Sequence, residues 1–351
     1  MDASQQRFTA LRGLWQFHLL RAELRPALAL GEDLFGQAQR VHDPSLLLEA
    51  HRALGSTLYW CGEFATARAH FAQGMARYDP QQHHTHAFRY GLDPGVTCLT
   101  YMALALWGLG YPDQAYRRGE ESLALARQLA HPVSLTFALT FTAMLHQFRR
   151  EASAAQACIE ADIAIATEQG FRQWIQMDTF LHGWALAQQG NMEEGIAEMR
   201  QGMAAWRAMG ADLHRPYFLA LLAEAQAKVG QAEEGLQLLA EAFTIVRHNG
   251  ERLNEAELYR LQGELLLTQA STQPKLEQAE VSMRQALAVA RQQQAKSLEL
   301  RAAMSLSRLW RRQGRSEEAL QLLSEVYDWF TEGFETADLQ EAKILLETLQ
   351  K

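Results

Sequence analysis

A cluster of histidines stands out in the segment 78–95, which interrupts a chain otherwise rich in Ala, Leu, Gln, Glu and Arg. The cluster consists of His83, His84 and His86, and the acids nearest to it are Asp79 and Asp93. Imidazole and carboxylate groups bind metals such as zinc, but a tetrahedral site needs four ligands that converge on one point. The side chains of adjacent histidines diverge, and the segment contains no cysteine. The pattern is more typical of a polar connecting loop, so we predict neither a metal site nor a cofactor.

Acid–base catalysis would need perturbed histidines or carboxylates that converge in one cleft. The histidine candidates for this role are His83, His146, His182 and His214. No phosphate-binding GxxxxGK[ST], zinc-binding HExxH or nucleophilic GxSxG motif accompanies them. Most paired carboxylates, such as Glu193 and Glu194, directly follow a turn, where the dipole of a starting helix favours negative charge. We therefore predict a protein that is not an enzyme and has no catalytic residues.

The composition, with 48% hydrophobic and 21% charged residues, is typical of a folded globular chain. A net charge of −8 argues against binding to nucleic acid or to an anionic membrane surface. The N-terminus lacks the apolar core of a signal peptide, and no uncharged apolar run approaches the ~18 residues that span a bilayer. The three cysteines, Cys61, Cys98 and Cys158, are isolated in sequence. These features predict a reduced, cytoplasmic protein.

The elements that would position any site follow a repeat. A small residue recurs after each polar turn, at intervals of 40 residues except for one of 48 and one of 44. These small residues are Ala27, Ala67, Ala115, Ala155, Gly195, Gly235, Ala279 and Ala319. Twelve positions upstream a second small residue recurs, as in Gly55, Gly183 and Ala223. Small residues at both places allow the two helices of one unit to cross closely.

This pattern, with a large apolar residue four positions after the first small one, resembles the tetratricopeptide repeat. The standard repeat has 34 residues, so units of about 40 imply longer helices or connections. The resemblance implies an all-α fold: a right-handed tetratricopeptide-like superhelical solenoid of about eight helix pairs with a C-terminal capping helix. We expect one solenoid over residues 1–351. Its expected parts are units at about 5–45, 46–90, 94–131, 132–170, 172–210, 213–250, 252–294 and 296–334, a capping helix at 337–350 and an insert at 79–94.

Several strings, among them FRYGLDPGV, GYPDQA and HQFRRE, are similar to the C-terminal repeat region of bacterial signalling proteins with an adenylate/guanylate cyclase domain and an AAA-type ATPase module. The similarity extends from about Leu54 to Leu267. Because this chain has only the repeat part, the resemblance implies a sensor or scaffold region and transfers no cyclase or ATPase activity. It names an ATPase or cyclase module as a candidate partner.

In such arrays the first helix of each unit lines the concave surface. We expect its groove positions six and three residues before, and one and four after, the second small residue. In the second unit these are Glu49, Arg52, Ser56 and Tyr59. The candidate binding residues are Tyr59, Thr100, Trp107, Phe137, Met144, Phe180, Trp184, Tyr217, Arg215, Arg260, Arg301 and Arg308. The alternative is that tight superhelical winding buries these side chains against one another.

Two functions remain open. The first is a non-enzymatic module that holds a peptide or protein partner in the groove, with a regulatory role in bacterial signalling. The second is a sensor that binds a small apolar molecule in a central pocket under the segment 78–95. In this segment we expect Asp79-Pro80 to end one helix and Asp93-Pro94 to start another. His83, Phe88 and Tyr90 would form a lid. An open groove through five or more repeats favours the first function, and a closed cavity within repeats two to five favours the second.

Overall fold

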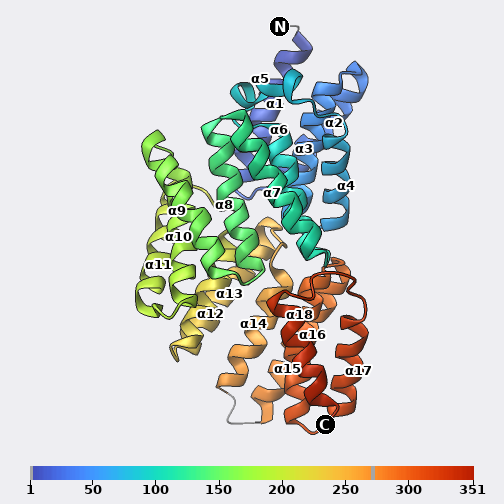
Figure 1. The fold of residues 1–351 in the computed structure, drawn as a ribbon, viewed down its shortest axis with the longest axis vertical. Coiled ribbons are helices and arrows are strands. Elements are labelled where there is room, and N and C mark those ends of the chain that lie inside the picture. Colours follow the sequence, from blue (N-terminus) through green and yellow to red (C-terminus); the bar gives the residue numbers. More distant parts are fainter. Residues whose placement is uncertain (1–2, 270–272) are drawn as a thin grey trace.

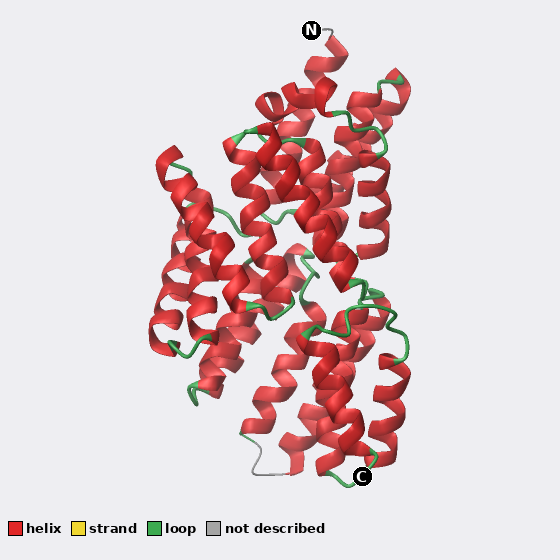
Figure 2. Cartoon of the chain, viewed as in Figure 1, coloured by secondary structure: helices red, strands yellow, loops and turns green. Residues whose placement is uncertain are grey.

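The computed structural model of the chain describes residues 3–269 and 273–351, and these residues contain eighteen helices and no strand (Figure 2). The helices are α1 (Ala3–Leu20), α2 (Leu24–Val41), α3 (Pro44–Trp60), α4 (Phe64–Met75), α5 (Pro80–Tyr90), α6 (Pro94–Gly108), α7 (Pro112–Leu129), α8 (Pro132–Phe148), α9 (Ala152–Gln169), α10 (Arg172–Gln188), α11 (Met192–Ala208), α12 (Arg215–Lys228), α13 (Ala232–Asn249), α14 (Glu255–Thr268), α15 (Gln273–Gln292), α16 (Lys296–Arg312), α17 (Ser316–Tyr327) and α18 (Ala337–Leu349).

Within the described residues the helices form eight packed pairs, from α1 with α2 to α16 with α17. Helix α5 is an additional helix between the second and third pairs, and α18 packs on the last pair (Figure 1). The predicted all-α solenoid of eight helix pairs with a capping helix is therefore confirmed. Figure 1 also shows that the chain winds from the N-terminal helices at the top to the C-terminal helices at the bottom.

Small residues allow the closest crossings within a pair, as the repeat predicts. A Cβ atom added at Gly183 of α10 would lie 2.5 Å from the Gly195 carbonyl oxygen of α11, and Gly195 meets the Gly183 carbonyl in the same way. Glycine also provides the turn between these two helices, where Gly190 has a φ of 101°. The small residues therefore recur because the backbones of paired helices are in contact at these positions.

The segment 79–94 differs from the expected loop, because Asp79-Pro80 starts helix α5. The Asp79 side chain accepts a hydrogen bond from the Gln81 N–H at 2.9 Å, and Pro80 occupies the first turn. Asp43-Pro44 starts α3 in the same way. A carboxylate cap followed by proline is typical of a helix start, so the expectation that Asp79-Pro80 ends a helix was wrong.

The solenoid closes on itself with a regular offset of five units. The Leu20 carbonyl at the end of α1 accepts the N–H groups of Asp212 and Leu213, just before α12. The Trp60 carbonyl at the end of α3 accepts the Arg252 N–H at 2.9 Å, just before α14. The Trp107 carbonyl of α6 accepts the Ser297 hydroxyl at the start of α16. Each contact joins the negative end of one helix dipole to the positive end of another.

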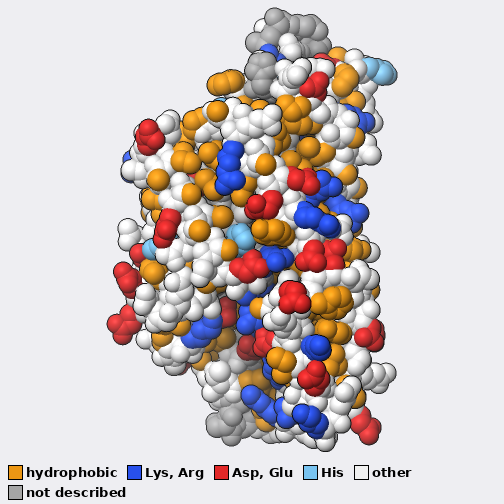
Figure 3. Space-filling model, viewed as in Figure 1, with side chains coloured by type: hydrophobic (Ala, Val, Ile, Leu, Met, Phe, Trp, Pro, Cys, Tyr) orange, Lys and Arg blue, Asp and Glu red, His pale blue; other side chains and the backbone are white. Residues whose placement is uncertain are grey.

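This closure turns the inner face of the solenoid into the interior of the molecule. Tyr59, Met144 and Phe180, expected to line a groove, are each 0% exposed and belong to the main hydrophobic cluster. In the described part of the chain no helix combines the length and apolar character needed to cross a bilayer. On the face shown in Figure 3, acidic and basic side chains lie next to one another rather than in an extended patch of one sign.

Candidate functional site

The inner face of the described residues contains two cavities of about 200 Å³ each with contrasting linings. We call the first the charged chamber. Its charged lining consists of Arg150, Lys228, Arg260, Arg301, Arg308, Glu224, Glu257, Glu264, Asp338 and Glu341, and its aromatic lining includes Trp107, Phe148, Trp184 and Tyr217. We call the second the aromatic cavity. It is lined by Trp15, Tyr90, Tyr101, Phe137, Phe141, Trp174 and Trp206, together with Arg52, Ser56, Thr97 and His214.

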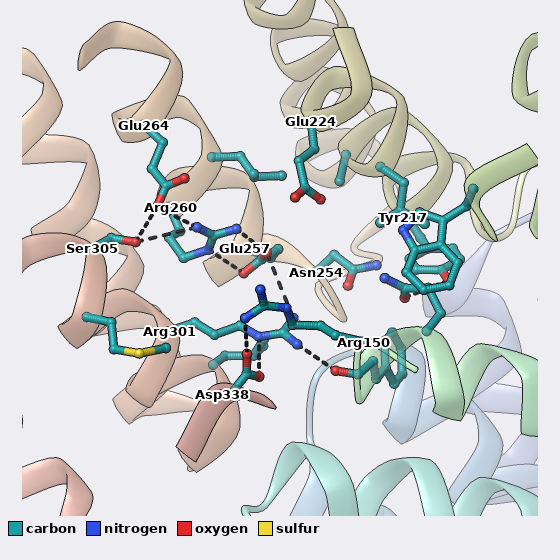
Figure 4. Close-up of a pocket in the computed structure, with 18 of the residues that line it drawn as sticks. Arg150, Tyr217, Glu224, Asn254, Glu257, Arg260, Glu264, Arg301, Ser305 and Asp338 are labelled. Atoms are coloured by element: carbon teal, nitrogen blue, oxygen red, sulfur yellow. Dashed lines mark hydrogen bonds and ion pairs between the residues drawn. The ribbon is translucent and has the colours of Figure 1, made fainter. Parts of the chain in front are cut away.

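Arg260 on α14 organises one wall of the charged chamber. Its guanidinium pairs with Glu257 at 2.6 Å and with Glu264 at 2.7 Å, and Ser305 on α16 donates to Glu264 at 2.6 Å (Figure 4). Burial would raise the pKa of Glu257, but Arg260 and Arg301 lower it below its usual value. Burial would likewise raise the pKa of Glu264, but Arg260 lowers it, so the partly buried Arg260 favours the ionised form of both carboxylates.

Arg301 on α16 joins this wall to the capping helix. It donates to Asp338 of α18 at 2.7 Å and to the Phe148 carbonyl at 2.5 Å, and its guanidinium lies 5.0 Å from the centre of the Trp107 ring. Arg150 donates to the same Asp338 at 3.2 Å (Figure 4). Helix α18 therefore does more than cap the solenoid, because it supplies a carboxylate that the chamber arginines share.

The charged chamber is internally balanced. Five basic and five acidic side chains line it, and each takes part in an ion pair. The charged groups of the lining are thus paired, but one uncharged group is not. Within the residues described, the buried side-chain amide of Asn254 has no hydrogen-bond partner for its Nδ2. An amide donor of this kind can pair with a peptide carbonyl.

A buried ionic network borders the aromatic cavity. Glu49 of α3 is 0% exposed and accepts from Arg52 at 3.0 Å, from Arg12 of α1 at 3.5 Å and from His86 of α5 at 2.9 Å. Two guanidinium groups thus share one carboxylate, and arginine keeps its charge in proteins. The nearby Asp93 is itself held by the Tyr78 hydroxyl and the Val96 N–H. Among the groups bonded to Glu49, two guanidinium groups therefore face one carboxylate.

Several polar atoms at this cavity are buried without a partner. Among the described residues, Arg52 Nη2, Ser56 Oγ and Tyr90 Oη make no hydrogen bond, and the same holds for Arg12 Nη2. Arg52 and Ser56 are each 1% exposed. Leaving such a group buried and unsatisfied costs about 1–3 kcal/mol, and more when it is charged. Such atoms are rare in native interiors and each calls for an explanation.

His214, which lines the aromatic cavity, and Glu251, which is bonded to its backbone, are both buried. Burial lowers the pKa of His214 to about 3, against a smaller opposing effect of the Leu213 backbone. Burial raises the pKa of Glu251 to about 8, although the backbone N–H of His214 donates a hydrogen bond to its carboxylate at 3.1 Å. His214 packs edge-on to Trp60 and Trp206 and has a left-handed φ of 75°. Burial therefore favours the neutral form of both groups, and neither ring nitrogen of His214 has a hydrogen-bond partner among the described residues.

The residues expected in one groove are divided among four environments, of which Arg215 occupies one by itself. Six of them line the charged chamber: Trp107, Trp184, Tyr217, Arg260, Arg301 and Arg308. Phe137 lines the aromatic cavity. Tyr59, Thr100, Met144 and Phe180 pack in the interior, Thr100 bonding to Ser122 at 2.7 Å and Phe180 stacking on Phe218. Tight winding, the alternative considered above, explains the last group.

Arg215 does not join either cavity. It pairs with Asp212 at 2.8 Å and with Glu241 of α13 at 2.6 Å, beside α11. Successive helix residues are about 100° apart, so Arg215 points almost opposite to Tyr217, which lines the charged chamber.

The angular spacing of helix residues also separates the residues expected to form a lid, His83, Phe88 and Tyr90. Phe88 and Tyr90 would share a side in an extended loop, but on helix α5 they lie about 200° apart. Tyr90 lines the aromatic cavity, whereas Phe88 is 78% exposed and its ring lies edge-on to His131. The expectation that both fold back on the array was wrong for Phe88. His83 is buried and bonds to Ser45 at 3.0 Å, outside the cavity lining.

The histidines considered for catalysis do not meet in one cleft. His146 pairs with Glu151 and His182 with Glu198, each at 2.6 Å and in a different unit. Among the described side chains, from which His84 is excluded, no group of three or more His, Cys, Asp or Glu residues could hold a metal ion.

Sequence reasoning missed the contributions of α1, α5 and α18. A usable signal existed for α1, because Trp15 lies twelve residues before Ala27. Counting groove positions from Trp15 gives Arg12, Gln16 and Leu19, and all three lie at the network or the aromatic cavity. For Asp338 and Glu341 the signal was weaker: the arginines at the C-terminal groove positions required counter-ions from some other element.

Comparison with known proteins supports the fold. No family model matches the chain, and no curated protein is similar to it in sequence. A Rap protein complexed with competence and sporulation factor superimposes with a TM-score of 0.61 over 98% of both chains, at 9% identity. The Rap conjugation gene regulator of plasmid pLS20, solved with the Phr* peptide, gives 0.57 over 98% of this chain and 96% of the other, at 10% identity.

A chain of the APC/C hetero-tetramer Cut9–Hcn1 is also similar, with a TM-score of 0.61 and 11% identity. The match covers 97% of this chain but only 55% of that one, so this chain spans about half the length of that relative. At such identities the likeness shows the fold alone. That fold is a right-handed tetratricopeptide-like helical solenoid.

Proposed function

We propose that the chain is a non-enzymatic binding module that holds a segment of a peptide or protein partner at the charged chamber. The observation that carries this proposal is the convergence of Trp107, Trp184, Tyr217, Arg260, Arg301 and Arg308 on one cavity from units three to eight. Tryptophan, tyrosine and arginine are the residue types that dominate binding energy at protein interfaces.

The balanced charges of the charged chamber fit a polypeptide better than a simple ion. A peptide offers carbonyl and N–H groups as well as side chains of both signs, which can exchange with the existing ion pairs. The free Nδ2 of Asn254, which has no partner within residues 3–269 and 273–351, can donate to a backbone carbonyl. The similarity in fold to a Rap regulator solved with the Phr* peptide lends further support.

We place this module in bacterial signal transduction, in the cytoplasm, with an ATPase or cyclase module as a candidate partner. The strings FRYGLDPGV and GYPDQA, which resemble cyclase-linked repeats, support this context. The three cysteines are unpaired in the described part of the chain, and burial raises the pKa of the Cys61 and Cys158 thiols to about 11. Thiols of this kind suit a reducing compartment.

Selection from a random peptide display library on the immobilised protein tests the proposal. Glu224→Arg reverses a half-exposed charge at the charged chamber at small cost to the fold, and Glu347→Arg makes the same change on the exposed surface of α18. Peptides selected on the wild type are expected to bind Glu347→Arg equally well and Glu224→Arg at least tenfold more weakly. Equal binding to all three proteins, or no selected peptide, contradicts the proposal.

A second function is favoured by a specific observation, the aromatic cavity beneath helix α5. Tyr90, Gly91 and Leu92, all from the segment 78–95, form part of its lining. We propose that this cavity binds a small molecule. It lies apart from the charged chamber, and the two linings share no residue, so the two functions are compatible.

A further inference from the structure

We propose that the aromatic cavity is a site for a small aromatic monocarboxylate, whose acid group is held by Arg52, Ser56 and Tyr90 and whose ring lies among the cavity's aromatic side chains. This inference rests on the second proposed function, a small-molecule site, and names its ligand class. It replaces the apolar ligand that the sequence suggested.

The sign of the ligand charge follows from the buried network. Arg12 and Arg52 share the single carboxylate of Glu49, and His86 bonds to the other oxygen of that carboxylate. A second anion beside Arg52 would give each guanidinium its own counter-charge. A cation would instead place a second positive charge beside the buried guanidinium of Arg52, which is strongly unfavourable.

The nature of the acid group follows from the free donors. In the described part of the chain, Arg52 Nη2, Ser56 Oγ and Tyr90 Oη have no hydrogen-bond partner, and all three residues line the aromatic cavity. A carboxylate has two oxygens with about four acceptor sites and no donor, so it can accept from all three groups. Hydrogen bonds from a guanidinium to a carboxylate are among the strongest in proteins.

The size and body of the ligand follow from the remaining lining. A cavity of about 200 Å³ exceeds the ~150 Å³ that accommodates benzene and falls short of the ~300 Å³ at which drug-sized sites begin. Tyr101, Phe137 and Phe141 contact one another at ring distances of 5.4–5.8 Å and 4.6 Å, which provides ring faces and edges for a further aromatic group. A single ring with a short acid arm, roughly ten non-hydrogen atoms, fits these limits.

The unsatisfied donors also argue against a purely structural role. If Ser56 and Tyr90 served only to stabilise the fold, their hydroxyl groups would have partners. Instead, within residues 3–269 and 273–351, both are buried without one. Removing an unpaired buried hydroxyl is neutral or stabilising, whereas removing one that contacts a ligand weakens binding. The two roles therefore predict opposite outcomes for the same substitution.

The test is calorimetric titration with benzoate, phenylacetate and phenylpropionate, and with the neutral amides of the same shapes. We expect the best acid to bind at least tenfold more tightly than its amide. Ser56→Ala combined with Tyr90→Phe should weaken binding of that acid by about tenfold or more, while the thermal midpoint stays unchanged or rises. Tyr116→Phe, on the half-exposed ring of Tyr116 on α7, is the matched control and should bind like wild type.

Arg52→Gln should remove the preference for acid over amide. If an amide binds as tightly as its acid, the cavity is a small-molecule site but the inference of an anionic ligand is wrong. If neither acids nor amides bind at millimolar concentration, both the inference and the second proposed function fail. If Ser56→Ala with Tyr90→Phe lowers the thermal midpoint and leaves acid binding intact, the hydroxyl groups have a structural role and the assignment is overturned.

Discussion

The charged chamber and the aromatic cavity lie on the same inner face but satisfy their polar groups in opposite ways. In the chamber every charged side chain has a counter-charge, and Arg150, Arg260 and Arg301 each contact two carboxylates. At the aromatic cavity the described residues leave Arg52, Ser56 and Tyr90 each with a buried atom that lacks a partner. Ion pairs thus stabilise the walls of the charged chamber, where Asn254 is the one described lining residue with an unpartnered buried side-chain atom. At the aromatic cavity several unpartnered buried donors favour a small ligand that supplies acceptors.

The largest expected effect is a loss of stability when an ion pair of the charged chamber is removed. Arg260→Met leaves the partly buried Glu257 and the half-exposed Glu264 without their main counter-charge, and we expect the free energy of unfolding to fall by about 2–3 kcal/mol. Chemical denaturation measures this. Arg200→Met, which removes an exposed pair with Glu234, should change it by less than about 1 kcal/mol. Similar effects of the two substitutions would mean that the chamber ion pairs are not a stability feature.

An intermediate effect is expected from pH, through the buried Glu251 that is bonded to the His214 backbone. The folded-state pKa of Glu251 is raised to about 8 from 4.5, so its contribution to stability is fully present below about pH 4.5 and is lost as pH rises through 8. The folded-state pKa of His214 is lowered to about 3 from 6.5, so its contribution is lost on acidification and is constant above pH 6.5. Of these two groups, only Glu251 makes a contribution to stability that changes with pH above pH 6.5.

Between pH 6.5 and 8, wild type should therefore lose up to about 2 kcal/mol of stability that Glu251→Gln does not lose. Denaturation of both proteins over this range gives the difference, and effects of other groups, such as the buried Asp178, cancel in it. Parallel pH curves for the two proteins would indicate that Glu251 is ionised in the folded state.

The smallest expected effect is the change in the free energy of unfolding when the Ser56 hydroxyl is removed. Ser56→Ala should leave the free energy of unfolding unchanged or raise it by up to about 1 kcal/mol, because the hydroxyl makes no hydrogen bond within the described residues. Ser122→Ala is the matched comparison, since the buried Ser122 hydroxyl bonds to Thr100 and to the Val96 carbonyl. It should destabilise by about 1 kcal/mol. Equal losses would remove the distinction between the two kinds of buried polar group.

Much of the fold could be predicted because small residues recur in the sequence at the positions where paired helices cross. Gly183 and Gly195 are in contact for that reason. The pitch of the superhelix has no comparable signature, since it accumulates from small rotations between units. Whether Tyr59 or Trp107 would face a groove or an interior depends on that pitch. Contacts five units apart, such as Arg252 with the Trp60 carbonyl, settle it.

The candidate site was predicted in part, for a related reason. The groove rule located Trp184, Tyr217 and Arg301, because side-chain direction on a regular helix follows from position alone. It did not locate Asp338, which comes from a helix outside the repeat. The role of Tyr90 depended on recognising α5 as a helix, and Asp79-Pro80 signals either the end or the start of one.

Photo-crosslinking of a selected peptide tests the central claim, that the inner face is the binding surface, most directly. A library peptide that binds the protein would carry a photoreactive group, and mass spectrometry would map the crosslinked residues. The account predicts crosslinks to residues of the charged chamber on α10, α12, α14 and α16, with loss of crosslinking in Glu224→Arg. Crosslinks confined to the outer helices, such as α2, α4, α7 and α13, would contradict it.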